Sequence, residues 1–203
     1  EIGKYRNLTR AELQALGHVF RTRSDTEVIV HAWEAWGEAC VTRFRGMFAF
    51  ALWDRNKQTL FLARDRLGVK PLYYAMLDDG MLLFGSELKA LLVHPLLRRV
   101  IDPAAVEEYF AYGYVPEPRT IFRSALKLPP GCTLALRRGD KLREPRVYWD
   151  VPFKPGPHLS EADAIEELTA RLRDSVKVRL MSEVPLGAFL SGGVDSSGVV
   201  AMM

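Results

Sequence analysis

Apolar and polar positions near the start of the chain follow the spacing of helices. Apolar residues recur every three or four positions in 9–16 and again in 24–36, which places them on one face of each helix. Each stretch opens on a Thr or Ser that is followed three residues later by Glu, as in a capping box, and each is closed by a glycine. We therefore predict two short helices, capped by Thr9 and Ser24.

Continuous apolar runs come next, and short polar turns separate them. The runs 47–53 and 59–63 predict a hairpin that is buried on both faces, because they are largely unbroken by polar residues. A second hairpin, 71–77 with 81–84, is joined by an Asp-Asp-Gly turn. Strands that are adjacent in sequence and joined by tight turns pair antiparallel. This part of the chain is therefore predicted to form antiparallel sheet.

Two helices and a third hairpin complete this part of the chain. Ser86 is predicted to cap a short helix, and Asp102 followed by Pro103 is predicted to start a longer one. Prolines exclude regular structure between that helix and the next strand. The last predicted hairpin joins 132–136 to 146–149.

A proline-rich stretch, 151–158, marks the boundary between two domains. We predict one domain over 1–150 and the start of a second domain, cut short, over 159–203. Ser160 begins the first helix of the second domain through another capping pattern. The apolar face of this helix is lined by Ile165, Leu168, Leu172 and Val176.

The stretch 190–197 (LSGGVDSS) has the composition of a phosphate-binding turn. The apolar run 186–190 predicts a buried strand that leads into it. Two adjacent glycines allow positive φ and a close approach of backbone N–H groups to an anion, and Ser196 opens a helix whose positive end points to the same place. Asp195 would repel bare phosphate unless a divalent cation bridged them, which indicates magnesium pyrophosphate. A plain strand-to-helix turn is the alternative on turn chemistry alone.

Composition narrows the class of protein. The 203 residues, 48% of them hydrophobic, can form one domain and part of another. The net charge of +3 indicates no nucleic-acid partner, and no apolar run reaches the length of a membrane span. Cys40 and Cys132 lie far apart without a metal-ligand pattern, and the first residues lack a signal-peptide core, which is typical of a cytoplasmic protein with two unreactive thiols. The histidines have no carboxylate or cysteine at catalytic spacing, which predicts packing or surface roles for His18, His31, His94 and His158.

Several stretches resemble, in the same order, the glutamine-hydrolysing asparagine synthetases of the B type. The SGGVDSS loop, preceded by Val-Pro-Leu-Gly, is similar to the pyrophosphate loop of the N-type ATP pyrophosphatases. The other matching stretches are 48–50, 64–68, 70–74, 85–91 and 128–131. The resemblance implies an α+β fold, in which an N-terminal-nucleophile (Ntn) αββα antiparallel sandwich forms a type 2 glutamine amidotransferase domain. The start of an α/β N-type ATP pyrophosphatase domain follows it.

The resemblance also implies a reaction, the ATP-dependent synthesis of asparagine with glutamine as the nitrogen source. In that family ammonia is freed from glutamine in the first domain; in the second, ATP adenylates aspartate and ammonia then displaces AMP. We accordingly expect ATP and Mg²⁺ as cofactors and glutamine and aspartate as substrates. Neither nucleic acid nor membrane is expected as a partner, and a homodimer is one candidate assembly. Two alternatives stay open: a related enzyme with another carboxylate acceptor, such as a β-lactam or exopolysaccharide precursor, and a non-catalytic glutamine-binding protein.

The resemblance assigns site residues at two places in the chain. The residues that it implies for ATP and pyrophosphate are Leu190, Ser191, Gly192, Gly193, Asp195, Ser196 and Ser197. Among them, Asp195 would ligate magnesium and Leu190 would lie beside the nucleotide. Asp25 matches the aspartate that binds the α-ammonium of glutamine, and Glu1 matches a second glutamine contact. Spacing alone leaves the role of Asp25 open, because the helix dipole also favours an acid in a first turn.

The sequence departs from the family at the nucleophile. In the family this is a cysteine at the mature N-terminus whose own α-amine helps to activate the thiol, whereas residue 1 here is Glu. We expect that about the first third of the glutaminase domain is absent, that this chain holds no catalytic residue, and that it is inactive on its own. For Arg64 and Asp65 we predict a loop ion pair, and for Ser86 and Glu87 a helix start.

Overall fold

Two antiparallel sheets form the centre of the structure, a computed structural model that describes residues 5–153, 156, 158–180 and 185–203. The strands of the larger sheet, in spatial order, are β1 (Ala49–Asp54), β2 (Thr59–Arg64), β6 (Cys132–Arg137) and β7 (Arg146–Val147). The strands of the smaller sheet, in spatial order, are β4 (Leu82–Gly85), β3 (Tyr73–Met76) and β5 (Leu126–Lys127). Every strand pair in both sheets is antiparallel, which confirms the predicted α+β class.

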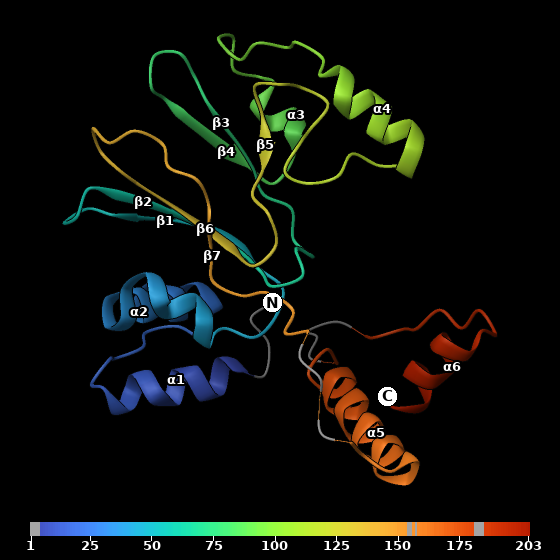
Figure 1. The fold of residues 1–203 in the computed structure, drawn as a ribbon. Helices are drawn as coiled ribbons and strands as arrows, with labels where there is room; N and C mark the ends of the chain where they lie inside the picture. The colour runs from blue at the N-terminus through green and yellow to red at the C-terminus, as the bar shows by residue number, and fades with distance from the viewer. Residues whose placement is uncertain (1–4, 154–155, 157, 181–184) are drawn as a thin grey trace.

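Helices lie on the outer sides of both sheets, and two further helices follow the sandwich (Figure 1). They are α1 (Tyr5–Ala15), α2 (Asp25–Trp36), the 3₁₀ helix η1 (Gly37–Arg43), α3 (Leu88–Leu91), α4 (Pro103–Tyr112), α5 (Glu161–Lys177) and α6 (Val194–Ala201). Helix α2 lies between α1 and the larger sheet, whereas α3 and α4 lie on the side of the smaller sheet (Figure 1). Helices α5 and α6 follow the sandwich, and an ion pair of 2.8 Å between Arg45 and Asp174 joins α5 to it.

Side chains of β2 alternate between two cores. Phe61 and Ala63 point toward the helices and pack in one cluster with Val28 of α2. Leu60 and Leu62 point the other way, into a cluster between the two sheets. This is the twofold side-chain period of a strand that is covered on both faces. Phe61 and Leu62 have no exposed surface, and burial of each contributes about 1.5–3 kcal/mol to stability.

A third cluster closes the stack of layers. Ala75 of β3 and Leu91 of α3 pack together on the outer face of the smaller sheet. With the two clusters at β2, the order of layers is helix, larger sheet, smaller sheet, helix. This order agrees with the αββα sandwich implied by the resemblance.

The prediction that the first hairpin is buried on both faces holds for β2 but is wrong for β1. Ala51 pairs with Leu62 and Trp53 pairs with Leu60, so these β1 side chains share the inter-sheet face. Ala51 is nevertheless exposed, and Trp53 is 47% exposed. The described part of the smaller sheet does not extend over this edge strand, and an apolar run by itself does not reveal that.

The predicted start of the first helix is wrong. Helix α1 already begins at Tyr5, so Thr9 lies inside it, where its backbone is helical and cannot act as an N-cap. Thr9 is buried instead, with 3% of its surface exposed. The predicted stop at Gly17 is confirmed, because this residue adopts a φ of 92° just after the last turn.

Helix α2 starts at the predicted cap, with one change. The Ser24 side chain accepts a hydrogen bond from the backbone N–H of Thr26 at 3.2 Å. Glu27 does not bond back to the backbone of Ser24; it accepts hydrogen bonds from the N–H groups of Arg21 and Thr22, each at 2.7 Å. These bonds, together with one from the Thr22 hydroxyl, lower the pKa of Glu27 to about 2. The connection before α2 is therefore tied to the helix by a carboxylate.

Helix α3 does not start as predicted, whereas α4 does. The N-cap of α3 is Glu87 and not Ser86, and it makes no side-chain capping bond. At α4, the Asp102 carboxylate accepts from the N–H of Ala104 at 3.2 Å, and Gly113 ends the helix at a φ of 79°. The left-handed backbone there is a conformation that glycine adopts without strain.

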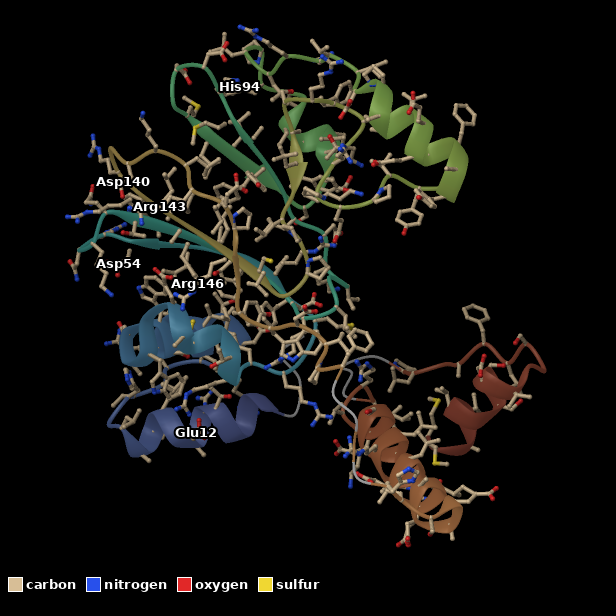
Figure 2. All side chains as sticks on the ribbon, viewed as in Figure 1. Glu12, Asp54, His94, Asp140, Arg143 and Arg146 are labelled. Carbon is tan, nitrogen blue, oxygen red and sulfur yellow. The ribbon has the colours of Figure 1, made fainter. Side chains whose placement is uncertain are left out.

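Replacing Asp102 by alanine should lower the free energy of unfolding by about 1 kcal/mol, because the first turn of α4 loses its cap. Urea unfolding followed by circular dichroism measures this. Asp140→Ala is the matched control, since Asp140 lies in the loop between β6 and β7 beside Arg143, at 4.0 Å, and precedes no helix (Figure 2). Equal losses in the two variants would contradict the capping role.

The remaining hairpin and the proline-rich segment agree with prediction except at one point. Strands β6 and β7 pair antiparallel, with Thr133 opposite Arg146. Within the segment predicted to lack regular structure, β5 pairs with β3 over Leu126 and Lys127. No proline occurs between residues 119 and 128, so the backbone N–H groups needed for a ladder are present there.

Asp54 fastens the β1–β2 turn to α2 (Figure 2). Its carboxylate accepts hydrogen bonds from the N–H groups of Lys57 and Asn56, at 2.8 and 2.9 Å, and from the indole of Trp33, at 2.8 Å. The bond from Lys57, then those from Trp33 and Asn56, hold the pKa of Asp54 below its ordinary value of 3.8. The charged form is thus favoured in the folded protein.

This carboxylate should make stability fall in acid. Because the folded pKa of Asp54 is lowered, its contribution is present above the unfolded value of 3.8 and is lost as the pH falls toward the folded value. We expect Asp54→Asn to be less stable than the parent at pH 7 and the difference to shrink at pH 3. Urea unfolding monitored by tryptophan fluorescence at both pH values tests this, and a difference that grows in acid would contradict it.

The C-terminal part contains the predicted helix but not the predicted strand. Ser160 caps α5 through the N–H of Asp163 at 3.2 Å, as expected. Residues 185–190 form no strand with any described residue, and Phe189 is fully exposed. A strand forms only against a hydrogen-bonding neighbour, and none of the described strands pairs with this segment. The apolar stripe of α5 is uncovered at Ile165 and Leu168, which are 58% and 66% exposed, whereas Val176 at its other end is buried.

Among the helices that the structure describes, none combines the length and apolar character that a bilayer crossing requires.

Candidate functional site

A hollow of about 330 Å³ opens where the first turn of α2 meets the start of β1. Asp25 lies in that turn, immediately after the Ser24 cap, and is half-buried. The hollow is lined by Asp25, Thr26, Ile29, Met47, Phe48, Ala49, Phe50, Lys70, Pro71 and Ser86. It therefore combines a carboxylate, an ammonium and a hydroxyl with apolar walls, which is the usual make-up of a small-molecule site.

Asp65 positions two walls of this hollow. The side chain is 1% exposed, and its carboxylate accepts hydrogen bonds from the backbone N–H groups of Phe48 at 3.2 Å and Lys70 at 3.0 Å. It also accepts from Leu67 at 3.2 Å and Val69 at 3.0 Å. One buried carboxylate thus joins the start of β1 to the loop after β2, and both segments face Asp25 across the hollow.

The predicted ion pair between Arg64 and Asp65 is wrong. Arg64 pairs with Glu117, at 2.6 Å, and donates to the carbonyls of Lys70 and Leu128 at 2.8 and 2.7 Å. Side chains of successive residues in extended backbone point to opposite sides, so adjacent Arg and Asp do not meet. Asp65 is satisfied by backbone N–H groups instead. The prediction of a structural role for both residues agrees with these contacts.

Lys70 and Ser86 were missed as lining residues by sequence reasoning. Their proximity to Asp25 depends on how the loop after β2 folds back, and no spacing in the sequence shows it. The one local signal is the glycine at 68, whose φ of 63° turns the loop toward Arg64. Residues 65–70 therefore form a loop that folds back on itself, and the N–H of Lys70 at its end bonds to the Asp65 carboxylate at its start.

Neither cysteine is a candidate nucleophile. Cys40 is 1% exposed, and burial raises the pKa of its thiol to about 12. Cys132 is 4% exposed, and burial raises its pKa as well. A thiol attacks only as thiolate, so both groups are inert at neutral pH. This agrees with the prediction of two unreactive thiols.

The second predicted site lies at the start of α6, on different elements from the first (Figure 1). Helix α6 begins at Val194, two residues earlier than predicted, so Asp195 lies in its first turn. Gly192 has the expected positive φ of 78°, but Gly193 is extended, with φ −74°, and serves as the N-cap. The expectation of positive φ at both glycines is therefore wrong for Gly193, because a residue that enters a helix takes the β region.

The side chains at this turn converge. The hydroxyl oxygens of Ser191 and Ser196 are 2.9 Å apart, and the Ser196 hydroxyl also donates to the carbonyl of Gly193 at 3.1 Å. A Cβ built on Gly192 would meet no atom within 4 Å, so the turn is open on that side. Leu190, Asp195 and Ser197 are exposed around it. Two hydroxyls at a helix N-terminus, with a carboxylate beside them, fit an anion that is shared with a divalent cation.

Glu1, the other residue predicted to contact glutamine, lies outside the described residues.

One prediction about the histidines is wrong. A carboxylate does stand beside them, since the Nδ1 atom of His31 is 2.8 Å from Glu34, and the Nδ1 atom of His18 is 3.1 Å from that of His31. The spacing of His31 and Glu34, three residues apart on a helix, was a usable signal for the first contact. The contact with His18 comes from the packing of the connection after α1 against α2.

Comparison with known protein families shows to which family the domain that contains the first site belongs. The family described as glutamine amidotransferase domain matches residues 1–149, which include the whole sandwich. The chain belongs to the glutamine amidotransferase family. A second family, described as asparagine synthase, matches residues 167–203, which include most of α5 and all of α6.

Curated relatives match nearly the whole chain. Asparagine synthetase [glutamine-hydrolyzing] 3 of Bacillus subtilis is 41% identical over 95% of this chain and 31% of its own length. Asparagine synthetase [glutamine-hydrolyzing] 1 of the same organism is 39% identical over 100% of this chain and 31% of its own length. Amidase chyE of Penicillium rubens is 34% identical over 98% of this chain and 28% of its own length. The chain therefore spans about a third of the length of these relatives, and the resemblance to asparagine synthetases is confirmed.

Proposed function

We propose that this chain is part of an ATP-dependent amide synthetase that uses glutamine as its nitrogen source and aspartate as its acceptor. The observation that carries the proposal is the order of two family matches on one chain, glutamine amidotransferase at 1–149 and asparagine synthase at 167–203. A domain that releases ammonia and a domain that consumes it are thereby linked covalently. The proposed domain limits are 1–150 and 159–203, with 151–158 as the linker.

The hollow at Asp25 is the proposed glutamine site. An α-ammonium group needs an anionic partner, and Asp25 brings a half-buried carboxylate to the wall of a hollow of about 330 Å³. Glu1 is proposed as the second glutamine contact. The nucleophile would come from an N-terminal cysteine of the full-length protein, because burial keeps Cys40 and Cys132 protonated.

The turn before α6 is the proposed site for ATP and Mg²⁺. Ser191, Ser196 and the N-terminus of α6 supply hydroxyl and N–H donors for a pyrophosphate group. The other residues of the proposed cradle are Leu190, Gly192, Gly193 and Ser197, and Asp195 is the proposed magnesium ligand. When bound, ATP supplies a good leaving group that activates the acceptor carboxylate. The loop's own contribution is to hold negative charge in place by donors that are already oriented.

The test uses the full-length protein. We also propose that this protein is cytoplasmic and forms a homodimer. Incubation with glutamine, ATP, Mg²⁺ and aspartate should yield asparagine, glutamate, AMP and pyrophosphate in equal amounts. Sedimentation at assay concentration reports the assembly state. Absence of pyrophosphate with every acceptor tried, while glutamine is still bound, would overturn the synthetase proposal in favour of a binding protein.

A second acceptor class is favoured by one observation. The relative named amidase chyE is 34% identical to this chain over 98% of this chain, so similar sequence occurs in a protein with a different name from the synthetases. Residues that would select the acceptor are proposed to lie outside this chain. Pyrophosphate release with another carboxylate, such as a β-lactam or exopolysaccharide precursor, and none with aspartate would identify that class.

A further inference from the structure

Two imidazoles and a carboxylate converge at the α1–α2 corner, away from both proposed sites. The Nδ1 atoms of His18 and His31 are 3.1 Å apart. The Oε2 atom of Glu34 is 2.8 Å from the Nδ1 of His31 and 3.5 Å from the Nδ1 of His18. Three electron-pair donors from two segments therefore surround one point.

These separations match the edges of a metal coordination shell. Zinc binds histidine nitrogen at about 2.0–2.1 Å and carboxylate oxygen at about 2.0–2.2 Å, so tetrahedral ligand atoms lie on the order of 3.3 Å from one another. The three observed separations, 3.1, 2.8 and 3.5 Å, require only small adjustments to reach this value. Two histidines and one glutamate with a position left for water is an established zinc ligand set.

Hydrogen bonds between neutral imidazoles and a charged carboxylate do not account for all three short separations at once. The Nδ1 atom of a histidine carries either one hydrogen or one lone pair, and that of His31 faces both His18 and Glu34. A single hydrogen there can be directed at only one of them. Protonating both imidazoles would place two positive charges side by side. A divalent cation satisfies both lone pairs and the carboxylate together.

The surrounding contacts hold the donors in place. Gly17, with a φ of 92°, reverses the chain after α1 and directs His18 toward α2. The ring of Phe20 packs edge-on against that of His31, with centroids 4.7 Å apart. Glu27 lies 3.8 Å from the other nitrogen of His31, so its negative charge stands on the far side of that ring. The His18 and His31 side chains are each only 19% exposed, so little reorganisation is required.

From this geometry we infer that His18, His31 and Glu34 form a binding site for a divalent transition-metal ion of the zinc type. The ion ties the connection after α1 to α2, the helix whose first turn carries Asp25. The site is independent of the proposed magnesium site at Asp195, which offers oxygen ligands suited to a harder cation.

Zinc titration of the full-length protein tests the inference. After removal of metals with a chelator, calorimetry with Zn²⁺ should show one site per chain that His18→Gln and Glu34→Gln each weaken by at least about tenfold, since loss of a ligand costs more than loss of an outer-sphere partner. Co²⁺ should give the visible absorption of a four-coordinate ion in the parent and lose it in both variants. Any zinc held by a cysteine elsewhere is common to parent and variants and cancels in the comparison.

Glu12→Gln and His94→Gln are the matched controls. The Glu12 side chain, on neighbouring α1, is 51% exposed, and that of Glu34 is 54% exposed. Glu12→Gln and Glu34→Gln therefore each remove one exposed carboxylate from the same helix pair. His94 lies at the opposite end of the sandwich from Glu12 (Figure 2). Both controls should keep the zinc affinity and the Co²⁺ spectrum of the parent. Because Glu34 is exposed, its variant should fold, and unchanged zinc affinity in Glu34→Gln would overturn the inference.

Discussion

Replacing Asp25 by asparagine in the full-length protein should lower kcat/KM for glutamine about 10- to 100-fold. The substitution keeps the shape of the side chain but removes the charge that the α-ammonium would meet. A hydrogen bond to a charged group is worth about 1.5–3 kcal/mol, which corresponds to this range. Glutaminase activity, measured as glutamate released at several glutamine concentrations, gives the value.

Synthesis from free ammonia separates a local effect from a global one. Asp25 lies in the sandwich, on different elements from the turn at α6, so Asp25→Asn should keep the parent's rate when ammonium salt replaces glutamine. Glu161→Gln is the control, because it also removes an acid from the first turn of a helix, α5. That variant should retain glutamine use. If Asp25→Asn hydrolysed glutamine like the parent, the hollow would not be the ammonium site.

Replacing Asp195 by alanine should lower amide synthesis about 100- to 1,000-fold, whether glutamine or ammonia is the nitrogen source, because removal of a group that stabilises developing charge typically has this effect. Asp195 lies in the first turn of α6 beside the hydroxyls of Ser191 and Ser196, and it is the proposed magnesium ligand. Pyrophosphate release at increasing Mg²⁺ concentration measures the loss. Glutamine hydrolysis should persist.

Two comparisons make this result specific. Asp195→Asn, which keeps the size of the side chain, should be impaired almost as much, because an amide is a poor magnesium ligand relative to a carboxylate. Glu166→Gln removes one charge from exposed surface of α5 and should leave synthesis intact. Parent-like pyrophosphate release by Asp195→Ala would remove Asp195 from the site.

The proposed glutamine site was predictable in part. The Ser24 cap and the acid that follows it are local features, and the structure places Asp25 in the first turn as expected. The hollow beside it was not predictable, because Asp65 builds it by gathering backbone N–H groups from Phe48 and Lys70. Such a buried carboxylate has no periodicity of its own, and its contacts depend on the paths of two separate segments.

In the loop before α6, too, some features were predictable from the sequence and others were not. Glycine at 192 identified a turn with positive φ, because that conformation strains every residue with a Cβ. The strand predicted for 186–190 is not formed, because a strand requires a partner and an apolar run supplies only the tendency to pair. The helix start moved from Ser196 to Val194, since Gly193 serves as the cap.

The sequence by itself determined most helices, the hairpins and the motifs of the glutamine amidotransferase family, because these depend on residues near one another in the chain. Tertiary structure alone decided that Trp53 stays 47% exposed on the edge strand and which residues line the hollow. It also brought His18 to His31, thirteen positions away. The physical reason is that long-range packing depends on which surfaces find partners, and no local spacing encodes the partner.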